Sequence, residues 1–97
     1  MRTEFVLRGT LADAVDAGAE AVSLERDVAG ETVGAAVETL TDAYPALEPL
    51  VLDSKGRLRA HLALRRDGED VRDGAWLATP LAAGERLELE PGTKGGC

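Results

Sequence analysis

One amphipathic helix that ends at a proline constrains the fold more than any other feature of this sequence. Apolar residues at positions 33, 36, 37, 40 and 44 repeat with the spacing of one helical face. Thr32 precedes them, and its hydroxyl can accept a hydrogen bond from the free N–H groups of the first turn. Pro45 has no backbone N–H and disfavours helical geometry at Tyr44. The sequence therefore predicts a helix over residues 32–44 whose apolar face needs a partner surface.

Segments of alternating apolar and polar residues on both sides of this helix predict strands. They cover residues 4–8, 21–26, 61–65 and 86–90, and residues 11–15 can form one short helical turn. The first two strands are joined by a connection of loop length, so we expect them to pair antiparallel. Asp67-Gly68 favours a type I′ turn, because both central residues of that turn need positive φ. Residues 69–72 would then form a short return strand.

This order of elements predicts an α+β domain over residues 1–90, with one main helix packed across a mixed sheet. The expected core joins the helix face to inward-facing strand residues: Val33, Val37, Leu40, Leu62, Leu64, Leu87 and Leu89. After the helix, Leu47, Leu50 and Leu52 are available for the same core. Trp76 precedes a turn and fits either a half-buried position or an exposed apolar contact for a partner.

Composition and charge exclude several classes of function. The 11 Lys and Arg residues face 18 Asp and Glu residues, so the clustered basic stripe of a nucleic-acid-binding protein is not expected. No apolar run approaches the roughly 18 residues of a membrane span, and no secretory signal is recognisable at the N-terminus. One cysteine cannot form an internal disulfide, which fits the cytoplasm.

The polar residues do not form a recognisable catalytic or metal-binding set. There is no Ser/His/Asp arrangement, no cluster with metal-ligand spacing and no justifiable pair of catalytic carboxylates, so the chain is not expected to be an enzyme. His61 lies on the polar side of its strand and is expected on the surface. Glu88 and Glu90 alternate outward on the last strand and are expected to be solvated.

The C-terminal residues 91–97 lack apolar periodicity and predict a flexible tail. Together with the element order, this tail resembles the ubiquitin-like β-grasp sulfur carriers. That family includes the small subunit of molybdopterin synthase, the thiamine-pathway sulfur carrier and the archaeal small modifier proteins. The resemblance rests on Gly9-Thr10-Leu11, Thr32-Val33-Gly34, Tyr44-Pro45-Ala46-Leu47, Arg57-Leu58-Arg59, Asp67-Gly68-Glu69-Asp70-Val71-Arg72, Thr79-Pro80-Leu81, Gly84-Glu85 and Gly95-Gly96.

The resemblance implies a ubiquitin-like β-grasp fold and a function at Gly95-Gly96. In such carriers a ubiquitin-activating-like enzyme uses ATP to adenylate the terminal carboxylate, here that of Gly96. Attack on the adenylate by a sulfide or persulfide then gives a thiocarboxylate, and attack by a lysine amine gives an isopeptide bond. The carrier itself binds no cofactor and no metal. A molybdopterin-synthase large subunit is a further partner that the resemblance implies, while the sulfur acceptor (pterin, thiazole or tRNA) stays open.

Cys97 departs from the family pattern, because functional members usually end at the second glycine. The resemblance implies either removal of Cys97 by a metalloprotease specific for ubiquitin-like tails, or a chain that is not activated as it stands. The alternative function is therefore a non-catalytic β-grasp module that binds proteins and is never activated.

The net charge of −7 predicts that stability depends on salt. An acidic surface with few lysines fits either a protein adapted to high salt or an ordinary acidic protein from a GC-rich genome. In the first case, salt relieves the repulsion among carboxylates, so Tm should rise between low and molar salt. Thermal unfolding followed by circular dichroism measures this, and an unchanged Tm would contradict the adaptation to salt but not the fold.

Overall fold

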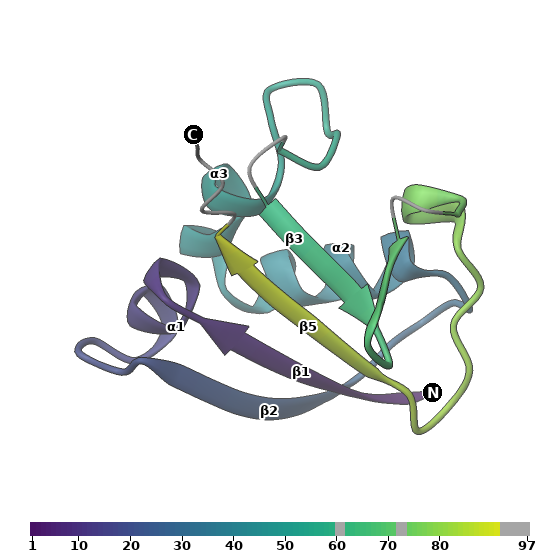
Figure 1. Cartoon of the computed structure of the whole chain (residues 1–97), viewed down its shortest axis with the longest axis horizontal. Coiled ribbons are helices and arrows are strands. Elements are labelled where there is room, and N and C mark those ends of the chain that lie inside the picture. Colours follow the sequence, from purple (N-terminus) through teal and green to yellow (C-terminus); the bar gives the residue numbers. More distant parts are fainter. Residues whose placement is uncertain (60–61, 72–73, 92–97) are drawn as a thin grey trace.

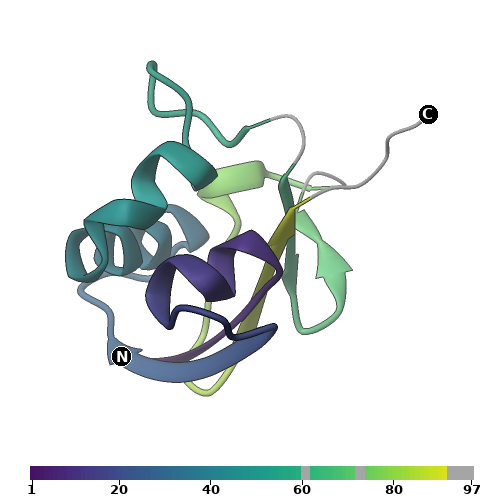
Figure 2. The same ribbon diagram turned by 90° about the vertical axis from the view of Figure 1, so that its left-hand side faces the viewer.

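The computed structural model describes residues 1–59, 62–71 and 74–91. The elements are β1 (Arg2–Arg8), α1 (Thr10–Val15), β2 (Ala21–Asp27), α2 (Val33–Ala43), the 3-10 helix η1 (Pro45–Leu47), α3 (Glu48–Val51), β3 (Leu62–Arg66), β4 (Glu69–Asp70), the 3-10 helix η3 (Trp76–Ala78) and β5 (Arg86–Pro91). The strands form one sheet in the order β2-β1-β5-β3-β4 (Figure 1). β1 and β5 are parallel and the other neighbours are antiparallel, so the predicted mixed sheet is confirmed. The helices α1, α2 and α3 lie on one side of it (Figure 2).

The main helix begins and ends as the sequence predicts. The Thr32 hydroxyl accepts a hydrogen bond from the Ala35 N–H at 3.1 Å. Tyr44, the residue before Pro45, leaves helical geometry while its N–H still donates to the Leu40 carbonyl. Both ends are therefore set by local chemistry, a capping hydroxyl and a proline.

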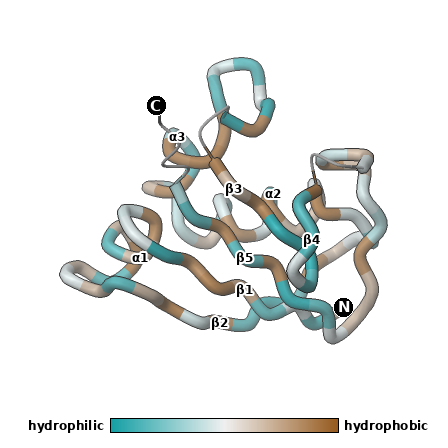
Figure 3. The backbone as a smooth tube through the Cα atoms, viewed as in Figure 1, coloured by the Kyte–Doolittle hydropathy of each residue, from teal (hydrophilic) through white to brown (hydrophobic). Residues whose placement is uncertain are grey.

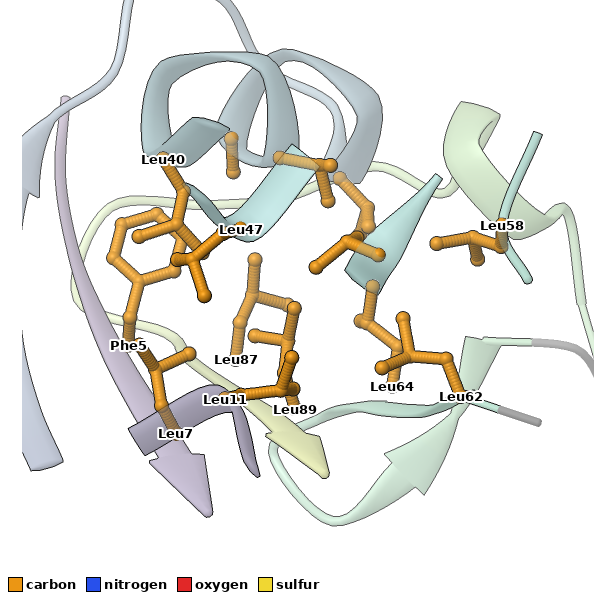
Figure 4. Packing of buried hydrophobic residues seen from close by; sticks show 14 of the residues in the cluster. Phe5, Leu7, Leu11, Leu40, Leu47, Leu58, Leu62, Leu64, Leu87 and Leu89 are labelled. Carbon is orange, nitrogen blue, oxygen red and sulfur yellow. The ribbon is translucent and has the colours of Figure 1, made fainter. Parts of the chain in front are cut away.

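The core lies between α2 and the inner face of the sheet, as expected. All of the predicted contact residues are buried, and they form one cluster with Phe5, Leu7 and Leu11 (Figure 4). Figure 3 shows the matching pattern along the chain, with hydrophobic stretches in β1 and β3 beside hydrophilic turns. This shared core fixes the helix on the sheet.

The segment after α2 corrects the sequence-based core. Leu50 is 37% exposed, whereas Leu47 and Val51 are fully buried. The reason is that this segment is helical, as η1 and α3, so residues four apart share the inward face and Leu50 falls off it. Leu52 is only half-buried. Trp76, at the start of η3, is 46% exposed, which matches the surface alternative for this residue.

Two boundaries also differ from the prediction. The Asp67-Gly68 turn has positive φ at both residues, 49° and 90°, as expected, but β4 covers only Glu69–Asp70. Val71 is buried, and Arg72 and His61 lie outside the described residues. β5 extends through Pro91, one residue past the predicted end of the domain, because Pro91 pairs with Leu62 of β3.

Truncating the α2 face should strongly destabilise the fold. Leu40 is fully buried, so Leu40→Ala should lower the free energy of unfolding by about 2–5 kcal/mol through lost burial and a cavity. The exposed Leu50 provides a matched control, since Leu50→Ala should lose less than about 1 kcal/mol. Urea unfolding measures both. A loss at Leu40 no greater than that at Leu50 would contradict the packing of α2 on the sheet.

Candidate functional site

The predicted site residues Gly95, Gly96 and Cys97 lie outside the described residues, and the structure describes the point from which their segment departs. That point is the end of β5, a strand with neighbours on both sides in the sheet. Leu89 of β5 pairs with Leu7 of β1 and with Leu64 of β3. Leu89 is fully buried, so the chain reaches residue 91 directly from the core.

Gly9 makes room for Pro91 at this point. Gly9 has φ 62° and ψ −134°, a conformation that is essentially restricted to glycine. A Cβ there would lie 3.0 Å from the Pro91 Cγ and 3.1 Å from its Cδ. Hydrogen bonds hold Gly9 in place, since its N–H donates to the Glu20 carbonyl and its carbonyl accepts from the Asp13 N–H. The sequence contained this glycine in a family motif, but only the structure gives the reason for it.

A small pocket of about 330 Å³ lies beside Pro91, at the end of the sheet from which the C-terminal segment leaves. It is lined by Thr10, Leu11, Pro49, Leu50, Arg59, Leu62 and Pro91. The exposed leucine that the sequence wrongly placed in the core therefore borders the origin of the C-terminal segment. Sequence reasoning missed this role, because only the helical form of residues 48–51 turns Leu50 outward.

The outer face of the sheet carries paired charges. Arg8 contacts Glu88 at 3.4 Å and Arg65 contacts Glu90 at 2.7 Å. The two glutamates lie on the outer face as expected, but they are only 20% and 33% exposed. They are covered because arginines from neighbouring strands reach across them. The hydrogen bond that Arg65 donates to the Glu90 carboxylate raises the pKa of Arg65 further above its ordinary value.

A third pair, Arg86 with Glu4 at 3.2 Å, extends these charges along β1 and β5. Alternating signs make this face polar and locally balanced, in contrast to the basic stripe that a nucleic-acid-binding surface needs. Within residues 1–59, 62–71 and 74–91, no group of three His, Cys, Asp or Glu side chains is placed to hold a metal ion. No helix in the same residues is long and apolar enough to cross a membrane.

The five-stranded mixed sheet with α2 packed across it defines the ubiquitin-like β-grasp fold, which is found in a class of small carrier and modifier proteins. Comparison with known families gives the same class: residues 10–96 match the model of the ThiS family. The chain belongs to this family.

Individual relatives agree with that assignment. Small archaeal modifier protein 1 of Haloferax volcanii is 42% identical over 71 residues, which are 72% of this chain and 77% of that protein. Its crystal structure superposes with a TM-score of 0.77 and 38% identity, covering 99% of this chain and all of that one. The sulfur carrier protein CysO of Mycobacterium tuberculosis is 32% identical over 69 residues, 69% of this chain and 74% of that protein. Relatives of this chain are thus small carriers and modifiers, not catalysts.

Adding a side chain at Gly9 should both strain the backbone and displace Pro91. Gly9→Ala should lower the free energy of unfolding by about 1–3 kcal/mol, because alanine disfavours this conformation and its Cβ meets the proline ring. Gly18→Ala is the control for positive φ alone, since nothing lies within 4 Å of a Cβ at Gly18.

Combining Gly9→Ala with Pro91→Ala should restore the part of the loss that comes from the ring, because Pro91→Ala removes both contacting atoms. Urea unfolding of the single and double variants measures this coupling. Strict additivity of the two substitutions would show that Gly9 does not position Pro91.

Proposed function

We propose that this protein is a ubiquitin-like sulfur carrier or modifier whose Gly96 carboxylate is adenylated by an ATP-dependent partner enzyme after Cys97 is removed. The observation that carries the proposal is the family match, which runs to Gly96 and leaves Cys97 outside. The position of β5 supports it, because a central strand leads from the core to the segment that contains Gly95-Gly96.

The chemistry follows from the weakness of a carboxylate as an electrophile. The carboxylate oxygen of Gly96 attacks the α-phosphate of ATP, pyrophosphate leaves, and a mixed anhydride with AMP forms. A sulfide or persulfide sulfur then attacks the Gly96 carbonyl carbon and AMP departs, which yields a thiocarboxylate once any sulfur–sulfur bond is reduced. If a lysine amine attacks instead, the product is an isopeptide bond. Glycines suit this end of the chain, since a backbone without Cβ passes through a narrow channel.

The partner enzyme must recognise the folded domain as well as the terminal glycines. The surface around Pro91 offers features that a partner can contact, with the exposed Leu50 beside the pocket and the Arg8–Glu88 pair on the outer face of the sheet. The proposal therefore assigns catalysis to the partner, and assigns recognition and the reacting carboxylate to this chain.

The presence of Cys97 is the reason to consider a second function. A peptide bond to Cys97 blocks the Gly96 carboxylate, so the full chain has no group to activate at Gly96. A metalloprotease specific for ubiquitin-like tails would remove this residue. Without such processing, the protein would act as a β-grasp module that binds a partner and is never charged.

Pyrophosphate exchange with the cognate adenylating enzyme distinguishes these functions. Three chains should be compared: the full chain, the chain ending at Gly96 and the chain ending at Gly95. We expect exchange only with the chain ending at Gly96, because only this chain presents the required carboxylate at the required distance from the domain. In that chain, Gly96→Ala should slow exchange more than Thr93→Ala, because a Cβ at the last residue obstructs the channel.

The outcomes separate the hypotheses. If the full chain is the best substrate, then Gly96 is not the reacting residue. If none of the three chains supports exchange with an enzyme from the same organism, the binding-module function is favoured. Intact mass of the protein from its native host gives a second test, since activation predicts loss of Cys97 and exchange of an oxygen for a sulfur at Gly96.

A further inference from the structure

Primary amines are scarce in this chain. Its 11 basic residues include only two lysines, Lys55 and Lys94, and the remainder are arginines. An activated carboxyl forms an isopeptide bond with an amine, whereas an arginine guanidinium stays protonated and does not react. If copies of this protein are joined to one another, the acceptor is therefore Lys55, Lys94 or the amino group of Met1.

The amino group of Met1 is engaged in the fold. It donates a hydrogen bond to the Val28 carbonyl at 2.8 Å and forms an ion pair with Asp27 at 3.2 Å. The Met1 side chain is only 12% exposed, because it packs against the core. Both contacts would have to break before this amine could approach the carbonyl carbon of a donor copy, so Met1 is a poor acceptor.

Lys55 lies near the tip of a short hairpin of residues 52–58, which we call the Lys55 hairpin. Its two ends meet in an antiparallel bridge between Leu52 and Leu58, and the Asp53 N–H donates to the Arg57 carbonyl at 2.8 Å. Leu58 is buried and anchors the hairpin to the domain. The tip stands away from the body of the molecule in both views (Figures 1 and 2), and it is hydrophilic (Figure 3).

The Asp53 carboxylate orders this hairpin without occupying the lysine side chain. One carboxylate oxygen accepts hydrogen bonds from the backbone N–H groups of Arg57 at 3.0 Å and Lys55 at 2.8 Å. The other oxygen pairs with the Arg57 guanidinium at 3.2 Å. These hydrogen bonds lower the pKa of Asp53, and the bond from the backbone N–H of Arg57 has the largest effect. Lys55 is exposed, and within the described residues no carboxylate is paired with its ammonium.

We propose that Lys55 is the acceptor through which a second, activated copy of this chain is attached. This inference rests on the proposed function, which supplies the adenylated Gly96 of the donor copy. The deprotonated Lys55 Nζ attacks the Gly96 carbonyl carbon, the new C–N bond forms, and the C–O bond to AMP breaks. AMP leaves with the electron pair, and the nitrogen releases one proton to solvent. The product is an isopeptide bond between Gly96 of one copy and Lys55 of the other.

The shape of the acceptor suits a donor of this size. The domain has a radius of gyration of 12.3 Å, while residues 92–96 span at most about 17 Å when fully extended. Two domains joined by so short a segment approach closely, so a lysine on a protruding hairpin is more accessible than one on a flat face. A domain attached at Lys94, two residues before Gly96, would block later activation of the acceptor copy, whereas attachment at Lys55 leaves that copy's Gly96 accessible to the activating enzyme.

Four chains ending at Gly96 test the proposal: the unsubstituted chain, Lys55→Arg, Lys94→Arg and the double variant. Each is incubated with ATP and the cognate adenylating enzyme, and linked products are separated by denaturing electrophoresis. Trypsin cleaves after residue 94 and leaves Gly-Gly on the acceptor amine, which peptide mass spectrometry locates. We expect the remnant on Lys55, unchanged linkage in Lys94→Arg, and loss of the linked dimer in Lys55→Arg and in the double variant.

Pyrophosphate exchange on the same four proteins separates failure of this inference from failure of the proposed function. Suppose that exchange is equal in all four proteins. If linkage is then undiminished in Lys55→Arg, or if the Gly-Gly remnant is found on Met1 or Lys94, Lys55 is not the acceptor, and the proposed function is unaffected. Exchange without any linked product also overturns Lys55 as the acceptor. Absence of exchange in every chain overturns the proposed function, and the Lys55 proposal with it.

Amine acetylation tests the accessibility argument without any enzyme. In the folded full chain we expect Lys55 to react as fast as it does in urea, whereas the Met1 amine should react more slowly than in urea. The native contacts of Met1 are the reason for that difference. Protection of Lys55 in the folded chain would overturn the proposal, because an acceptor amine must be open to a bulky donor.

Discussion

The burial of the apolar face of α2 against the inner face of the sheet holds the rest of this structure in place. Val33, Val37 and Leu40 lie in one cluster with side chains of the two central parallel strands, β1 and β5. Burial of such a face is the main source of stability for a helix of this length. Because β5 is the last strand in the sequence but central in the sheet, the same core fixes the point where the C-terminal segment begins.

This arrangement fixes the place on the domain from which the C-terminal segment starts. β5 carries the chain from fully buried Leu89 to Pro91 over two residues, and Gly9 leaves the space that the proline ring occupies. Under the proposed function, a partner enzyme would bind the surface around this point and act on Gly96. The exposed Leu50 lies at that surface, so the residue that the sequence misplaced is one that a partner can contact.

Charge has different roles on different parts of the surface. On the outer face of the sheet, Glu88 and Glu90 are partly covered and paired with arginines of neighbouring strands. At the Lys55 hairpin, the Asp53 carboxylate pairs with Arg57, and Lys55 is exposed. Since arginine supplies nearly all of the positive charge, these pairs form without creating further reactive amines. The scarcity of lysine therefore limits the amines available for the proposed attachment of a second copy.

The sequence by itself determined the features that depend on neighbouring residues. Thr32 and Pro45 set the ends of α2, and Asp67-Gly68 set the turn before β4, because capping, the loss of an N–H and positive φ act within a few residues. Only the tertiary structure decided which side of residues 48–51 faces the core, and that arginines from β1 and β3 cover the glutamates of β5. It also placed Pro91 against Gly9. These outcomes depend on contacts between residues far apart in the chain, which exist only after the sheet has formed around its last strand.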